Sequence, residues 1–163
     1  MRNIITASGW VCAILVSILV WNSGNLPRVL ATNGLRFLNP KGLSTPVARY
    51  SHAVVVPASE GLIFVSGEGG DDGSGKPVSD DVVAQTKQTM ENIKTALEAA
   101  GSDFSHVVKM NIYLTDMSRM PELRKVRDAY LDAKRAPAMT TAKVLELVGG
   151  IKVEIEVIAV PSK

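Results

Sequence analysis

The chain has few of the residues that bind metals or form disulfides. Cys12 is the only cysteine among 163 residues, so no disulfide can form within the chain and no thiolate cluster can hold a metal. His52 and His106 are the only histidines, and they lie far apart in the sequence without an HExxH-like spacing. The sequence therefore predicts no metal site and no cofactor, and its length allows one domain with an ordinary apolar core.

The chain also has little excess of charge of either sign. The formal net charge is +2. Before Thr32 the only charged side chains are Arg2 and Arg28, so the rest of the chain holds 16 basic and 16 acidic residues. A near-neutral body without a basic patch interleaved with aromatic residues argues against a nucleic-acid partner.

An uncharged apolar run covers residues 4–21, and Arg2 precedes it. This pattern is typical of a secretory signal peptide, and its length also suits a membrane-spanning helix. Small residues at 29–31 offer a cleavage site, although they lie well beyond the apolar run. A cleaved signal, an uncleaved anchor that associates with a membrane through residues 4–21, a buried core helix and a mistranslated start site are the open interpretations. We expect an exported (periplasmic or secreted) or membrane-anchored protein, and a cytosolic one if the start site is an artefact.

The composition divides the chain into three parts. Residues 1–31 are expected to form the signal peptide or membrane anchor. Residues 32–40 are expected to be a linker, because the stretch before Pro40 is rich in Asn, Gly and Pro. Residues 41–163 are expected to form one folded domain.

The periodicity of apolar residues predicts both strands and helices in the body. The expected order is a hairpin, a helix, a strand, a second helix and a second hairpin. The residues are 50–56 and 62–66, 80–100, 107–114, a helix capped by Ser118, and then 139–145 and 151–160 joined through Gly149 and Gly150. In the first helix one stripe is expected to be buried, formed by Val82, Thr86, Met90, Ile93, Leu97 and Ala100. This order indicates an α+β fold with both helices on one face of a sheet. The other face would stay half exposed unless another chain covers it, so the pattern predicts an oligomer.

Stretches spread over nearly the whole body resemble the Rid (reactive intermediate deaminase, YjgF-type) family. They occur in the family's order and spacing, at residues 46–53, 64–67, 85–86, 91–94, 97–101, 107–109, 113–117, 137–138 and 153–159. The resemblance implies a chorismate-mutase-like α+β subunit with a mixed sheet. It also implies a homotrimer that binds small-molecule substrates in clefts between neighbouring subunits.

The resemblance implies a reaction as well. Members of the best-known type hydrolyse 2-imino or enamino acids to 2-keto acids and ammonia. Carried onto this sequence, the family's catalytic glutamate is Glu154, which would position or activate water. The residues expected to contact the substrate are Tyr50, Ser66, Gly67, Ser118 and Met139.

Position 139 departs from the family. The best-known members have an arginine here that binds the substrate carboxylate in a bidentate pair, and the thioether of Met139 cannot do so. The resemblance therefore predicts that ordinary 2-imino acids are doubtful substrates. Arg135 is one candidate for a substitute cation at another position. Ser118 stands where the best-known members have asparagine, and Glu68 where they have glutamine.

Structural roles compete with these functional ones. Glu154 could be a polar residue on an exposed strand face, Tyr50 a core aromatic residue, and Met139 an apolar wall. The leading hypothesis is a deaminase or hydrolase that acts on a C–N bond of a small imine or enamine. The alternatives are a non-catalytic trimer that binds a small molecule, and an endoribonuclease-like activity, which the near-neutral charge disfavours.

Overall fold

The computed structural model describes residues 34–46 and 48–162. The apolar run at residues 4–21 lies outside the described residues, as do the first two residues of the expected linker, 32–33. The prediction of a membrane segment is corrected here, because no helix in the part of the chain that the structure describes is long and apolar enough to cross a bilayer.

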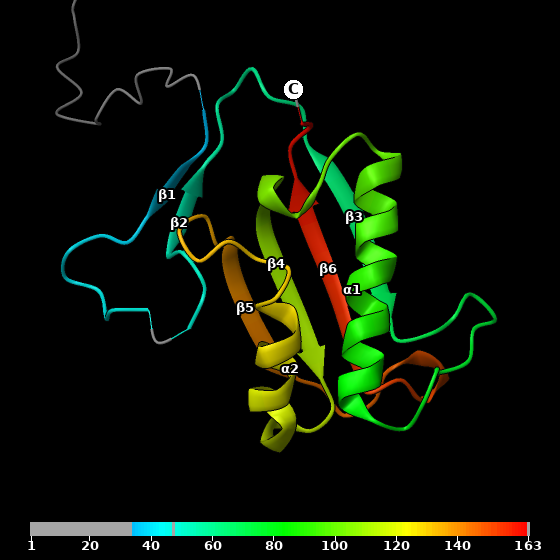
Figure 1. The fold of residues 1–163 in the computed structure, drawn as a ribbon. Coiled ribbons are helices and arrows are strands. Elements are labelled where there is room, and N and C mark those ends of the chain that lie inside the picture. Colours follow the sequence, from blue (N-terminus) through cyan, green and yellow to red (C-terminus); the bar gives the residue numbers. More distant parts are fainter. Residues whose placement is uncertain (1–33, 47, 163) are drawn as a thin grey trace, which may run out of the picture. The chain divides into compact units, whose positions relative to one another are not determined.

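The body is an α+β fold built on a mixed four-stranded sheet (Figure 1). The elements are β1 (Arg36–Leu38), β2 (Ala53–Val55), β3 (Ile63–Gly69), α1 (Val82–Ala99), β4 (Val107–Leu114), α2 (Met120–Arg127), β5 (Ala138–Lys143) and β6 (Val153–Ala159). The sheet has the order β3-β6-β4-β5, in which β4 and β5 are parallel and the other neighbours antiparallel. Helices α1 and α2 lie side by side over one face of this sheet, as the sequence predicted.

Neither expected hairpin forms. β2 pairs with β1, which lies in the expected linker, and β3 pairs with β6 instead of β2. β5 pairs with β4, so β6 does not pair with the strand that precedes it. Glycine and proline show where the chain turns, but they do not determine which strand a segment lies beside. The two strands with a regular apolar face, β4 and β6, take the two central positions because their alternate side chains are then buried under the helices.

Helix α1 follows its predicted stripe closely. Its N-terminus is capped by Asp81, whose carboxylate accepts a hydrogen bond of 3.0 Å from the backbone N–H of Ala84. The predicted stripe is buried except for Ala100, which follows the helix and is exposed. Gly101 then adopts a left-handed φ of 72°, which ends the helix at small steric cost.

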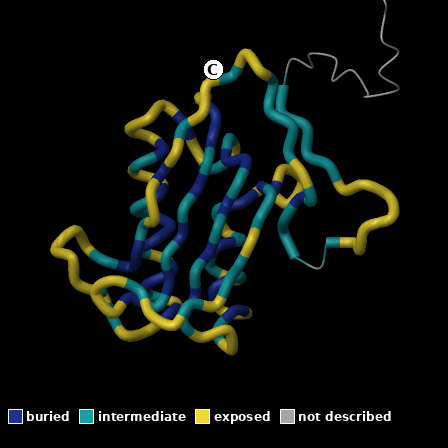
Figure 2. Tube along the Cα trace, turned by 180° about the vertical axis from the view of Figure 1, so that it is seen from behind, coloured by how far each residue is buried: buried dark blue, intermediate teal, exposed yellow. Residues whose placement is uncertain are grey.

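The two faces of the sheet differ in chemistry. On the helix side, Val153, Ile155 and Val157 of β6 are buried in the core. Between them, Glu154 and Glu156 point to the face that carries no helix. Figure 2 views the sheet from this second side, which is called the open face below.

Candidate functional site

The sheet separates the predicted site residues into two groups. Glu154 lies opposite Tyr113 in the ladder and points to the open face. Met139 lies opposite Met110, which is fully buried, so its side chain points toward the helices and packs against the core. Within one chain these two predicted site residues therefore lie on opposite sides of the sheet.

A bulge in β3 brings Glu154 against Gly67. The register between β3 and β6 shifts between Val65 and Glu68, which leaves Ser66 and Gly67 as the irregular residues. A Cβ atom on Gly67 would lie 2.8 Å from the Cδ of Glu154, so the carboxyl group occupies the space that any larger residue would need. The glycine at position 67 therefore allows the close approach of the carboxylate to the β3 backbone.

Around Ser66 the open face is hollowed. A hollow of about 380 Å³ is lined by Ser66 and Phe64 of β3, by Lys109 and Asn111 of β4, and by Glu156 and its neighbours on β6. Glu156 accepts hydrogen bonds from the amide of Asn111 (2.7 Å) and from the hydroxyl of Tyr113 (3.0 Å). Sequence reasoning missed this polar cluster, although the alternation of polar residues along β4 and β6 already placed its members on one face.

The two glutamates of β6 differ in their bonding. Glu156 is engaged by two donors, whereas the structure gives the Glu154 side chain no hydrogen bond among the described residues. The carboxylate of Glu154 is therefore available to a ligand or a water molecule on the open face.

Glu68 is a further acidic residue near Glu154, and its pKa is shifted. Burial raises the pKa of its carboxyl above the usual 4.5, and the nearby carboxylates of Asp71 and Glu154 raise it further. Glu68 consequently holds its proton more tightly than an exposed glutamate would.

Tyr50 and Met139 line the same cavity. It has a volume of about 260 Å³ and lies between α2, the first part of β5 and the segment before β2. Its walls are Ala48, Tyr50, Met117, Met120, Arg124, Arg127, Met139 and Thr141. Tyr50 is held there because the next residue, Ser51, donates hydrogen bonds to the carbonyl oxygens of Ala136 (2.7 Å) and Pro137 (3.0 Å). We call this space the Tyr50–Met139 cavity.

A buried arginine lies next to the sulfur of Met139. The side chain of Arg127 is 1% exposed, and its Nη1 lies 2.9 Å from Met139 Sδ. Its Nε and Nη2 both donate to Asp128 Oδ1, at 2.9 and 2.6 Å. Sequence reasoning missed Arg127, although it lies one helical turn after Leu123 on the buried face of α2.

Ser118 does not have the predicted role as cap of the second helix. It lies in a short 3-10 turn, Met117–Arg119, and its N–H and hydroxyl both donate to Asp116 Oδ1, at 2.9 and 2.8 Å. These two bonds are the main cause of the lowered pKa of Asp116. α2 begins at Met120 with Arg119 as N-cap and without a side-chain capping bond. Met117, and not Ser118, lines the Tyr50–Met139 cavity.

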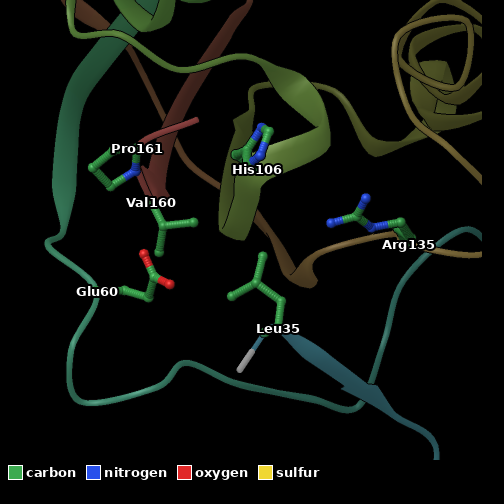
Figure 3. A pocket seen from close by; sticks show the side chains of 7 residues that line it. Leu35, Glu60, His106, Arg135, Val160 and Pro161 are labelled. Atoms are coloured by element: carbon green, nitrogen blue, oxygen red, sulfur yellow. The ribbon is translucent and has the colours of Figure 1, made fainter. Parts of the chain in front are cut away.

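Arg135, the candidate substitute for the family arginine, lines a different cavity. Its guanidinium lies 5.7 Å from the centre of the Phe37 ring. That cavity has a volume of about 280 Å³. Figure 3 shows Arg135 at one side of it, with His106, Glu60 and Val160 among the other lining residues. Arg135 is not among the residues that line the Tyr50–Met139 cavity, so the structure gives no support to that role.

Comparisons with known proteins agree with this architecture. The family model described as "Endoribonuclease L-PSP" matches residues 42–161. The protein DfrA of Myxococcus xanthus is 42% identical over 115 residues, which are 70% of this chain and 86% of that protein. The 2-iminobutanoate/2-iminopropanoate deaminase of Mus musculus is 37% identical over 70% of this chain and 82% of its own length.

Solved structures give the same result. A Rid-family protein of unknown function from Yersinia pestis, YyfB, superposes with a TM-score of 0.70 at 25% identity over 77% of this chain and 98% of that one. RidA from an Antarctic Psychrobacter is 34% identical with a TM-score of 0.57 over 77% and 98% of the two chains. With the mixed sheet, the two helices on one face and a family match across the whole body, the chain belongs to the Rid (YjgF) family.

Proposed function

We propose that this protein hydrolyses a small imine, or the imine tautomer of an enamine, to a carbonyl compound and ammonia. The observation that carries the proposal is the carboxylate of Glu154, which lies against Gly67 on the open face and has no hydrogen-bond donor among the described residues. A carboxylate in this situation can orient a water molecule and accept its proton. The names of the mouse and goat relatives, both 2-iminobutanoate/2-iminopropanoate deaminases at 37% and 36% identity, support the same reaction class.

The reaction has two steps. Water attacks the imine carbon, a C–O bond forms, and the π electrons of the C=N bond move to nitrogen, which takes up a proton. Glu154 accepts the proton that the water loses. Glu154 then passes this proton to the carbinolamine nitrogen, the C–N bond breaks as ammonia leaves, and the hydroxyl gives its proton to solvent as the C=O group forms. This last proton replaces the one that nitrogen took up in the first step, so one water is consumed for each ammonia released.

We propose further that the complete site forms between subunits of a homotrimer. Glu154 and the Tyr50–Met139 cavity lie on opposite sides of the sheet in one chain, so a second copy must supply one half if both act on one substrate. Apolar side chains that are exposed in the single chain support this assembly: Phe64 on the open face is 71% exposed, and Val148 in the loop before β6 is 88% exposed. Light scattering on the purified protein tests it, and a mass other than three chains contradicts it.

The activity test is ammonia release from 2-iminobutanoate generated in situ, and from an imine of similar size that lacks a carboxylate. We expect release above the uncatalysed rate from at least one of them, and a loss of roughly 100-fold or more in Glu154→Gln. Glu146→Gln, a change on an exposed loop residue, is the matched control and should keep full activity. A chain that binds these compounds but releases no ammonia would be a non-catalytic binding protein.

A further inference from the structure

We propose that helix α2 supplies the positive charge that residue 139 lacks. Arg124, with Arg127 behind it, would bind the carboxylate of a small organic acid in the Tyr50–Met139 cavity. This inference rests on the proposed function for its substrate class, and its binding test does not depend on turnover.

The cavity has the composition of an anion site. Two of its eight lining residues are arginines, and none of the eight is an aspartate or glutamate. The neighbouring carboxylate, Asp128, is already occupied, because it accepts two bonds from Arg127 and lies 3.8 Å from the guanidinium of Arg49. Two guanidinium groups thus share one carboxylate, and Arg124 adds a third guanidinium, which leaves an excess of positive charge at the cavity.

Arg124 has an unused donor. Its Nε is buried and has no hydrogen-bond acceptor among the described residues. A buried N–H without a partner is costly, and a carboxylate is the acceptor that a guanidinium binds best. A ligand carboxylate in the cavity would satisfy this donor.

Arg127 also retains donor capacity on the cavity side. Nε and Nη2 bind Asp128. Among residues 34–46 and 48–162, Nη1 contacts only the thioether of Met139, which is a weak acceptor on a flexible side chain. A carboxylate can displace the thioether by rotation of the Met139 side chain. The same guanidinium adds to the field at Arg124 even without direct contact.

The remaining walls define the rest of the ligand. Met117, Met120, Met139 and Ala48 are apolar, and the ring of Tyr50 adds an aromatic wall. A volume of about 260 Å³ accommodates a short-chain acid rather than a large metabolite. These walls fit a short-chain acid with a small apolar side chain, and the proposed function makes it a 2-imino acid or its 2-oxo product. With the charge relocated to α2, the loss of the family arginine at position 139 does not exclude these acids.

The first test is a calorimetric titration of the full chain with 2-oxobutanoate and with its neutral amide. We expect the acid to bind, the amide to bind weakly, and Arg124→Gln to weaken binding of the acid roughly 10- to 100-fold. Lys125→Gln is the matched control, because Lys125 is exposed on the same helix and does not line the cavity. Wild type that binds acid and amide equally, or Arg124→Gln that binds as wild type does, would overturn the inference.

A second pair of variants tests the inference independently, in case Arg124→Gln does not fold. Met139→Glu places a carboxylate of the chain itself between the two arginines, and Met139→Gln is its neutral match. We expect Met139→Glu to unfold at a higher temperature than Met139→Gln at pH 7 and to abolish binding of 2-oxobutanoate. Equal or reversed melting temperatures would show that the cavity has no unbalanced positive charge.

The results also separate this inference from the proposed function. Charge-dependent binding without ammonia release supports the anion site and contradicts the deaminase. Ammonia release from 2-iminobutanoate with a KM that Arg124→Gln leaves unchanged supports the deaminase and contradicts the anion site.

Discussion

The carboxyl group of Glu154 occupies the space where residue 67 would carry a side chain, since a Cβ on Gly67 would lie 2.8 Å from Glu154 Cδ. The β3 bulge creates this approach, because it turns Gly67 toward the open face beside β6. The position of the proposed catalytic carboxylate therefore depends on the absence of a side chain one strand away.

Gly67→Ala should reduce ammonia release more than it reduces stability. The new methyl group forces the Glu154 side chain to rotate, and a catalytic group displaced by about 1 Å commonly loses about 100-fold in rate. Steady-state kinetics and thermal unfolding of the same samples measure both effects. Gly61→Ala is the control, because a Cβ there makes only an ordinary contact of 3.9 Å with Pro161. Full activity in Gly67→Ala would mean that the placement of Glu154 is irrelevant to the reaction.

Asp128→Asn should destabilise the fold far more than a substitution that removes an exposed ion pair. The guanidinium of Arg127 is almost completely buried, and Asp128 Oδ1 accepts two of its bonds. Removing one partner of a buried pair costs about 3 kcal/mol or more. Glu98→Gln, which breaks the exposed Lys94–Glu98 pair, should cost about 0.5 kcal/mol or less. Urea unfolding of the two variants measures the difference, and similar costs would contradict the buried charge at Arg127.

Glu68→Gln should become more stabilising as the pH rises. The pKa of Glu68 is raised in the folded state, so the folded protein binds this proton more tightly than the unfolded chain does. The contribution of Glu68 to stability therefore falls as the pH rises from 4.5 through the folded pKa. Unfolding free energies of wild type and Glu68→Gln, measured across this range, should diverge in favour of the variant and then level off. A constant difference at all pH values would refute the raised pKa.

Asp81→Ala should lower the free energy of unfolding by about 1 kcal/mol, because the N–H of Ala84 loses its cap. Its contact with Arg119 Nη2, at 3.2 Å, is exposed and adds little. Asp80→Ala changes the adjacent exposed acid, which is not the N-cap, and should leave stability almost unchanged. Chemical denaturation distinguishes the two, and an equal effect of both would indicate a general charge effect at the helix start.

Local patterns in the sequence determined much of the architecture. The stripe from Val82 to Leu97 predicted α1, and the alternation of Val153, Glu154 and Ile155 predicted β6 with its buried and open faces. These predictions succeed because the periods of a helix and a strand depend on the chain itself. Family motifs at residues 46–53 and 153–159 also predicted the fold class from the sequence alone.

Strand pairing was decided only by the tertiary structure. Both expected hairpins fail, since β3 pairs with β6 and β5 with β4. A turn signal is local, whereas the choice of partner depends on which arrangement buries the apolar faces of distant strands together.

In the candidate site, too, the sequence determined some features and the tertiary structure determined the others. The sequence by itself determined that Glu154 and Met139 are candidate site residues, and that the side chain at position 139 carries no charge. Only the tertiary structure decided that the two lie on opposite faces of the sheet. It also decided that Arg127 of α2, twelve residues before Met139 in the chain, contacts the Met139 sulfur. The physical reason is that the sequence specifies the chemistry of each side chain, whereas the packing of elements that are distant along the chain determines its neighbours.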